Sequence, residues 1–204
     1  MKSLHHFLRQ LEPLGWSPVG HLDPAVLSLL AEIGEEPRLV HAAVDSWDNA
    51  NLDKRQLRCH ETTTHYKWFI HYHNKLGYRV WLHQYKVLSD RRLGHAEVPH
   101  NHRYSLASVV LRGGFTHHLF ERTDGGIAEL ARERQSFSRG DVYMISYKQL
   151  HRLSQLADHT VTLVVESPAA RHYSEAFYDE SAEPRVFYDF VGLHSRLSAV
   201  MAAI

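Results

Sequence analysis

The interpretation starts from one stretch, Gly94-His95-Ala96-Glu97-Val98-Pro99-His100-Asn101-His102, which places two histidines one residue apart. Side chains two positions apart share a face of an extended chain, so both imidazoles can reach one metal ion from a single strand. The next segment, Ser105-Leu106-Ala107-Ser108-Val109-Val110-Leu111, favours a strand and ends at Gly113-Gly114, a natural turn. The pattern therefore predicts a strand that carries a pair of metal ligands.

A chain with 18 histidines also has ordinary surface histidines, so this pair needs independent support. That support comes from Phe137-Ser138-Arg139-Gly140-Asp141-Val142 and from Leu150-His151-Arg152. A Gly-Asp turn that enters a strand, with a histidine further on, brings a third imidazole back from a neighbouring strand. Three neutral imidazoles leave coordination positions open, as a catalytic metal requires. We therefore expect His100, His102 and His151 to bind one metal ion.

The composition fits one globular domain and excludes several classes of partner. The 204 residues contain 23 basic and 23 acidic side chains, without a basic block or an apolar run of membrane length, so we expect no nucleic acid and no membrane. The single cysteine, Cys59, excludes a disulfide framework and fits a reducing compartment. The N-terminus, Met1-Lys2-Ser3-Leu4-His5-His6, lacks the apolar core of a signal peptide. We expect a cytoplasmic protein, and the sequence leaves a homo-oligomer open.

The elements follow from periodicity and from turn residues. Helices are predicted over 4–11, from Asp23-Pro24 to a closing Gly34, and after Glu36-Pro37. Short strands separated by glycine turns indicate a sandwich or small barrel. The segment 127–134 fits either a strand or one turn of helix. The predicted strands cover 62–70, 78–88, 105–111, 115–122, 142–147, 151–154 and 161–166. We expect one domain, 1–204, with a helical part over 1–56, a barrel over 57–178 and a C-terminal helical extension over 179–204, clearest from Tyr188 on.

These motifs resemble the two-part signature of the cupin superfamily. The resemblance implies a mainly β fold, a cupin-like antiparallel β-barrel (jelly roll) with a metal inside it. The glutamate ligand of that family has no counterpart, because its position is Ala107. The remaining set resembles the three-histidine type found in cysteine dioxygenases and related thiol dioxygenases. The matching residues are Gly94, His100-Asn101-His102, Gly113, Gly140-Asp141 and His151.

The chain departs from the thiol dioxygenases in the residues that handle the substrate. The cysteine that the family joins to a tyrosine falls on Ala107. The histidine and the tyrosine that stand near the metal in that family fall on Val164 and Glu166. The arginine that binds the substrate carboxylate has no secure counterpart, and Lys67 and Arg79 are the candidates. The chain has the family's metal ligands but different residues around them, so strict cysteine dioxygenase activity is not expected.

The resemblance implies a non-haem iron-dependent oxygenase or dioxygenase that uses Fe(II) and O₂ on a small polar, amino-acid-like substrate. Three imidazoles also suit Zn, Cu, Ni or Mn, because affinity follows the Irving–Williams order. Two alternatives stay open at this point. One is an O₂-independent, metal-dependent isomerase or lyase, and the other is a non-catalytic ligand-binding cupin.

Glu166 is the candidate catalytic group with the most specific expectation. On the predicted strand 161–166, alternation puts residues 162, 164 and 166 on one face and Leu163 and Val165 on the other, outer face. An inward carboxylate can act as a base, as a fourth ligand or as the partner of a substrate amine. The alternative is a solvated glutamate at a strand end, since Glu is rarely buried unpaired.

Other strand residues are candidates for the pocket wall. Tyr85 and Tyr143 are assigned catalytic roles, and His83 joins Lys67 and Arg79 as a substrate-binding residue. Taken alone, each of them is more often part of ordinary barrel packing. His95 and Glu97 form a second, lower-ranked ligand pair of the H-x-E type. The adjacent His117 and His118 must point to opposite faces of a strand, so at most one can approach the metal.

Overall fold

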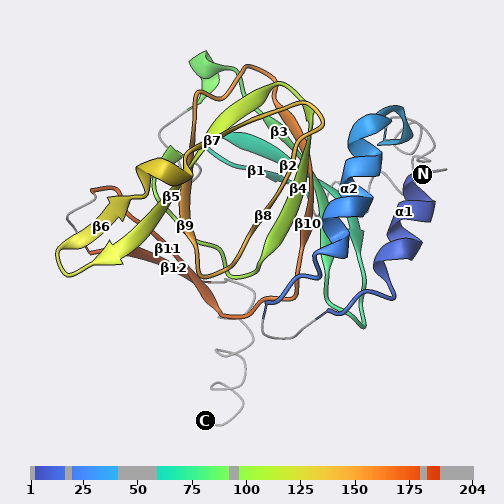
Figure 1. Ribbon diagram of the computed structural model, residues 1–204, viewed down its shortest axis with the longest axis horizontal. Coiled ribbons are helices and arrows are strands. Elements are labelled where there is room, and N and C mark those ends of the chain that lie inside the picture. The colour runs from blue at the N-terminus through green and yellow to red at the C-terminus, as the bar shows by residue number, and fades with distance from the viewer. Residues whose placement is uncertain (1–2, 17–19, 41–58, 92–96, 180–182, 189–204) are drawn as a thin grey trace, which may run out of the picture.

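The computed structural model describes residues 3–16, 20–40, 59–91, 97–179 and 183–188. These residues form a mainly β fold in which every paired strand is antiparallel (Figure 1). None of the described helices is long and apolar enough to cross a membrane.

The larger sheet holds six strands and provides one wall of the molecule. Its strands lie in the order β1 (His60–Glu61), β2 (His65–Tyr72), β3 (Arg79–Tyr85), β10 (Val161–Glu166), β4 (Leu106–Arg112) and β8 (Val142–Ile145). The predicted turn at Gly113 joins β4 to the next strand. Gly113 has a φ of +75°, which other residues rarely adopt. An added Cβ would also clash with Thr160 Oγ1, so this position needs glycine.

The second sheet is built around β5. One edge of β5 pairs with two short strands and the other with β9, and a separate two-stranded ribbon joins β11 and β12. The elements are β5 (Gly114–Thr123), β6 (Gly126–Glu129), β7 (Gln135–Ser138), β9 (Leu150–Ser154), β11 (Tyr173–Ala176) and β12 (Arg185–Tyr188), with short 3₁₀ turns η1 (Leu88–Asp90) and η3 (Ala131–Glu133). The ambiguous segment 127–134 therefore contains both a strand and a helical turn.

The predicted barrel is not closed in the part of the chain that the structure describes. Strands β1 and β8 are the edges of the larger sheet, and neither pairs with a strand of the second sheet. Side chains join the two sheets instead, because Tyr85 and Val110 from one pack with Phe115 and Leu153 from the other. The fold is mainly antiparallel β, as the sequence predicts, but two sheets face a shared interior (Figure 1).

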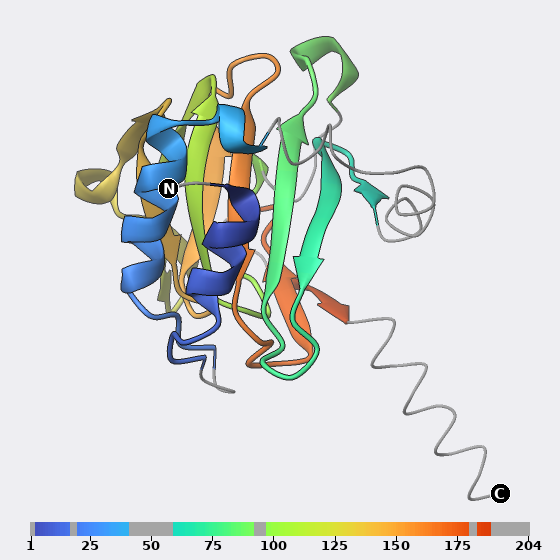
Figure 2. The ribbon, with the colours of Figure 1, turned by 90° about the vertical axis from the view of Figure 1, so that its right-hand side faces the viewer.

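Two helices cover the outer face of the larger sheet (Figure 2). α1 (Leu4–Leu11) has Ser3 as its N-cap, and the Ser3 hydroxyl accepts a hydrogen bond from the backbone N–H of His6 at 3.0 Å. α2 (Ala25–Glu35) buries Val26, Leu30 and Ile33 against the sheet. α1 coincides with the predicted range 4–11, whereas α2 begins within its predicted range and ends one residue beyond it. The third predicted helix falls mostly on 41–58, outside the described residues.

The alternation predicted for strand β10 is confirmed by its packing. Leu163 and Val165 belong to the apolar layer beneath the helices, whereas Val164 packs in the interior between the sheets. Ala107 on β4 also lies in the helix layer and is fully buried. Its small side chain faces the helices, so position 107 is not at the interior site.

Gly34 does not end its helix, contrary to the prediction. The helix continues to Glu35, and an added Cβ at Gly34 would lie 2.8 Å from Val109 Cγ2 and 3.3 Å from the Gly140 backbone. Glycine is therefore needed there for the close approach of α2 to strand β4.

We expect Gly34→Val to lower the free energy of unfolding by at least about 2 kcal/mol, because the added atoms overpack a rigid contact. The control is Ser28→Val, which changes an exposed position of the same helix and should alter stability by less than about 0.5 kcal/mol. Urea unfolding measures both. Equal effects of the two substitutions would show that the α2–β4 contact can relax.

The C-terminal prediction is partly wrong. Within 179–204, residues Arg185–Tyr188 form strand β12 and pair with β11, from Tyr173↔Tyr188 to Ala176↔Arg185. Val186, Phe187 and Tyr188 favour strands, and the unpaired edge of β11 supplies their backbone partners. The predicted helix from Tyr188 on falls on 189–204, outside the described residues.

Candidate metal centre

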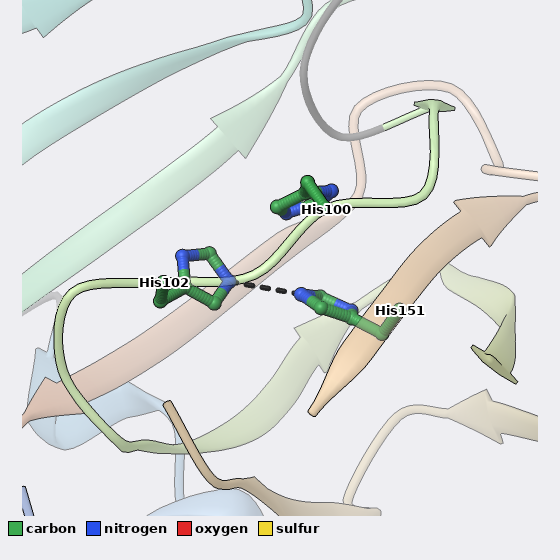
Figure 3. A group of neighbouring side chains, drawn as sticks. All are labelled: His100, His102 and His151. Atoms are coloured by element: carbon green, nitrogen blue, oxygen red, sulfur yellow. Dashed lines mark hydrogen bonds between the residues drawn. The ribbon is translucent and has the colours of Figure 1, made fainter. Parts of the chain in front are cut away.

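Three histidines from two distant segments meet in the interior. His151 lies on β9, and His100 and His102 lie on the segment that leads into β4 (Figure 3). This segment is not a regular strand, which corrects the prediction. His100 forms isolated bridges to His151 on one side and to Ala176 on the other. The ligand nitrogens of the three histidines lie within 4.8 Å of one another, so the cluster could hold a metal ion.

The spacing of two of these nitrogens fits a shared cation. His102 Nε2 and His151 Nε2 are 2.8 Å apart. Nitrogens bound at about 2.1 Å on adjacent positions of one metal lie about 3 Å apart. Two imidazole lone pairs repel each other at this distance, so either a proton or a cation must lie between them. The donor set therefore suits a divalent transition metal.

Hydrogen bonds orient two of the three rings. His100 Nδ1 lies 2.9 Å from the carbonyl oxygen of Val98, which can only accept, so this nitrogen carries the proton. His151 Nδ1 lies 3.0 Å from Nε2 of His117. Metal-bound histidines commonly hold their second nitrogen in this way. In both rings Nε2 is then left to face the centre.

His117 therefore helps to orient the ligand His151, whereas the adjacent His118 does not contact the site. Burial, together with His118, lowers the pKa of His117 to about 4, so it is neutral at neutral pH. His118 points away and contacts Glu129 Oε1 at 2.8 Å and Ser154 Oγ at 2.6 Å. The expectation that at most one of the pair approaches the site is confirmed.

The three histidines line a cavity of about 250 Å³ between the sheets. Of the residues predicted to handle substrate, Lys67, His83, Tyr85 and Tyr143 line the same cavity. Arg79, the first residue of β3, does not line it; its guanidinium lies over the ring of Tyr72, the last residue of β2, 5.7 Å from the ring centroid. Of the two candidate substrate cations, only Lys67 reaches the cavity.

Glu166 lies one layer behind the cavity wall. It is 2% exposed, so the solvated alternative does not hold, and its carboxylate forms an ion pair with Lys67 at 3.4 Å. Tyr104 also interacts electrostatically with Glu166. Although burial disfavours the charged ammonium, Tyr104 and Glu166 raise the pKa of Lys67. Lys67 therefore faces the cavity as a cation, and Glu166 supports it from behind.

The remaining candidates on the wall are uncharged at neutral pH. Burial, with Lys67 nearby, holds the pKa of His83 well below its usual value. Its Nε2 is buried and makes no hydrogen bond to any residue that the structure describes. Burial raises the pKa of Tyr143 to about 12, and burial beside Tyr143 raises that of Tyr85 well above its usual range. These groups can donate hydrogen bonds without carrying charge.

Sequence reasoning missed Tyr104. Its ring stacks on His102 with centroids 5.5 Å apart, and Tyr104 lines the cavity. Burial, then Glu166, raises its pKa to about 12. The signal was present, because Tyr104 follows His102 by two positions and so continues the face of the H-x-H pair.

Of the alternative ligand pair, His95 lies outside the described residues. The mainly β fold and the three-histidine cluster are compatible with the cupin resemblance. Comparisons with models of known protein families and with curated protein sequences found no match for this chain.

Proposed function

We propose that the protein is a non-haem metal-dependent oxygenase that binds Fe(II) through His100, His102 and His151 and acts with O₂ on a small polar substrate. One observation carries the proposal: among the described residues, three histidines and no carboxylate or thiol form the metal-binding cluster, and they line a cavity. Three protein ligands leave coordination positions open, which suits a catalytic and not a structural metal.

Iron(II) would supply the activation of O₂, and the chain supplies binding and orientation. His100 and His151 are held with Nε2 toward the centre by Val98 O and by His117. Tyr104 packs against His102 and limits how that ring can turn. The lining also includes apolar side chains, among them Leu106 and Val164.

The charges of the cavity favour a substrate with an anionic group. Lys67 and Arg103 line it, and no described aspartate or glutamate does. His83 adds a neutral donor. The cavity volume of about 250 Å³ suits a small molecule. The proposed substrate is therefore a small carboxylate or a similar anion, an amino acid included.

Oxygen uptake tests the proposal. Protein loaded anaerobically with Fe(II) is given air-saturated buffer and a panel of small carboxylates, sulfonates and amino acids, and O₂ is followed with an electrode. We expect uptake that matches substrate loss and that Zn(II)-loaded protein does not show. Turnover without O₂ uptake would instead assign isomerase or lyase chemistry. Retained metal with no turnover of any compound would indicate a binding protein.

We expect Lys67→Met to raise KM for an anionic substrate at least tenfold, about 1.4 kcal/mol, because the substrate loses its charged partner. The matched control is Lys86→Met, which breaks a 2.7 Å ion pair with exposed Glu61 outside the cavity and should leave KM unchanged. Steady-state kinetics measure both. An unchanged KM in Lys67→Met would remove the lysine from substrate binding.

A further inference from the structure

The two ligands of the H-x-H pair are held by different means. His100 is fixed to β9 by backbone bonds, because its N–H donates to His151 O and its carbonyl accepts from His151 N–H, both at 2.8 Å. The ladder does not continue to His102, since the bridges at His100 are isolated. His102 nevertheless places its Nε2 2.8 Å from that of His151, so something else must fix its position.

Asn101, between the two ligands, is bound to Glu175 of β11 by three hydrogen bonds. The backbone N–H of Asn101 donates to Glu175 O at 3.0 Å, and its side-chain oxygen accepts from the Glu175 N–H at 2.9 Å. Its amide nitrogen donates to Glu175 Oε2 at 2.7 Å. Asn101 is 1% exposed. Its side chain therefore takes the place of a backbone partner and extends the sheet by one position.

Arg171 holds the next peptide group. Its Nε and Nη2 donate to the carbonyl oxygen of His102 at 3.1 and 3.0 Å, and Nη2 also donates to Tyr147 O at 2.9 Å. A planar guanidinium gives such paired bonds in a fixed orientation, which a lysine does not. The peptide group that follows His102 is thereby held in place, which restricts the backbone that carries the ligand.

Glu175 links these two contacts. Its Oε2 accepts from Asn101, from Nη1 of Arg171 at 3.4 Å and from Nη2 of Arg122 at 2.8 Å. The carboxylate and Arg171 are largely buried, whereas the Arg122 side chain is 52% exposed. Buried, charge-assisted hydrogen bonds are strong and costly to break, and an exposed pair contributes little.

We infer that Asn101, Glu175 and Arg171 form a positioning unit that sets the place of His102 and thereby the geometry of the metal site. None of the three is a metal ligand, and none is a catalytic residue. The inference rests on the metal site of the proposed function, but not on O₂ chemistry. It predicts that loss of these contacts, none of which involves a metal-binding atom, weakens metal binding although all three histidines remain.

Metal-free full-length protein, titrated with Co²⁺, tests the inference. Visible absorption of Co²⁺ reports its coordination geometry, so the readout needs no substrate. We expect Asn101→Ala and Arg171→Met each to weaken Co²⁺ binding about 10- to 100-fold and to change the absorption bands. The control is Arg122→Met, which removes the exposed arginine from the same carboxylate and should leave both affinity and spectrum unchanged.

A second pair of variants separates positioning from general damage to the fold. Arg171→Lys keeps the charge beside Glu175 and loses the paired bonds to His102, so Co²⁺ binding should weaken as it does in Arg171→Met, while the thermal midpoint of the metal-free protein falls less than in Arg171→Met. Asn101→Asp sets two carboxylates against each other, and adding Glu175→Gln removes one charge and should recover part of the affinity.

Wild-type affinity and an unchanged spectrum in Asn101→Ala and Arg171→Lys would overturn the inference and leave the three-histidine site intact. Absence of Co²⁺ binding in the wild type would overturn the site itself, and with it the proposed function. Equal losses in Arg122→Met and Arg171→Met would assign the effect to the charge of Glu175 and not to the position of His102.

Discussion

Replacing His151 with alanine is expected to weaken metal binding at least about hundredfold and to abolish oxygen uptake. The loss of an outer partner of a ligand alone costs about 10- to 100-fold, so loss of a ligand should exceed that. His151 also contacts both another ligand, His102 at 2.8 Å, and the supporting His117 at 3.0 Å. His100→Ala and His102→Ala should have effects of the same kind. Metal analysis after anaerobic loading measures the stoichiometry.

Two control histidines distinguish loss of a ligand from loss of a buried side chain. His118 is buried like His151 but faces Glu129 and Ser154, so His118→Ala should reduce stability and leave metal stoichiometry unchanged. His5 is exposed on α1, and His5→Ala should change neither. Full metal loading of His151→Ala would contradict the three-histidine site. The pair His95 and Glu97 would then become the better candidate.

Glu166→Gln is expected to reduce turnover at least tenfold, about 1.4 kcal/mol of barrier, with metal still bound. The substitution keeps the shape of the side chain but removes the charge that pairs with Lys67 at 3.4 Å. Lys67 then loses part of what keeps its ammonium charged against burial, and Tyr104 loses the nearby negative charge that helps to raise its pKa. Both groups line the cavity, so the effect reaches the substrate through them. Turnover and metal content are measured on the same preparation.

The same substitution should also destabilise the fold, since removing one partner of a buried ion pair costs up to about 3–5 kcal/mol. Glu61→Gln is the matched control, because Glu61 is 62% exposed where it pairs with Lys86. An exposed pair contributes about 1 kcal/mol or less, and turnover should not change. Unchanged turnover in Glu166→Gln would show that the charge of this carboxylate has no role in the reaction. The metal and the tyrosines would then be the groups that act on the substrate.

The order of residues along single strands was enough to predict which side chains face the interior and which histidines form the site. Alternation along β10 assigned Leu163 and Val165 to the outer layer and Val164 to the interior, as the packing bears out. Residue type and spacing also selected the three histidines that the fold brings together, from a chain that contains 18. Strand periodicity and ligand chemistry are properties of neighbouring residues, so the sequence by itself carries them.

Only the tertiary structure decided how the site is completed. Lys67 and Glu166, 99 positions apart, meet because β2 and β10 flank β3, and no local pattern distinguishes Lys67 from Arg79. Asn101 and Glu175 are 74 positions apart and meet where the β11 ribbon reaches the H-x-H segment. Hydrogen bonds and ion pairs between distant segments depend on register and strand order, and the sequence leaves both open until the sheets pack.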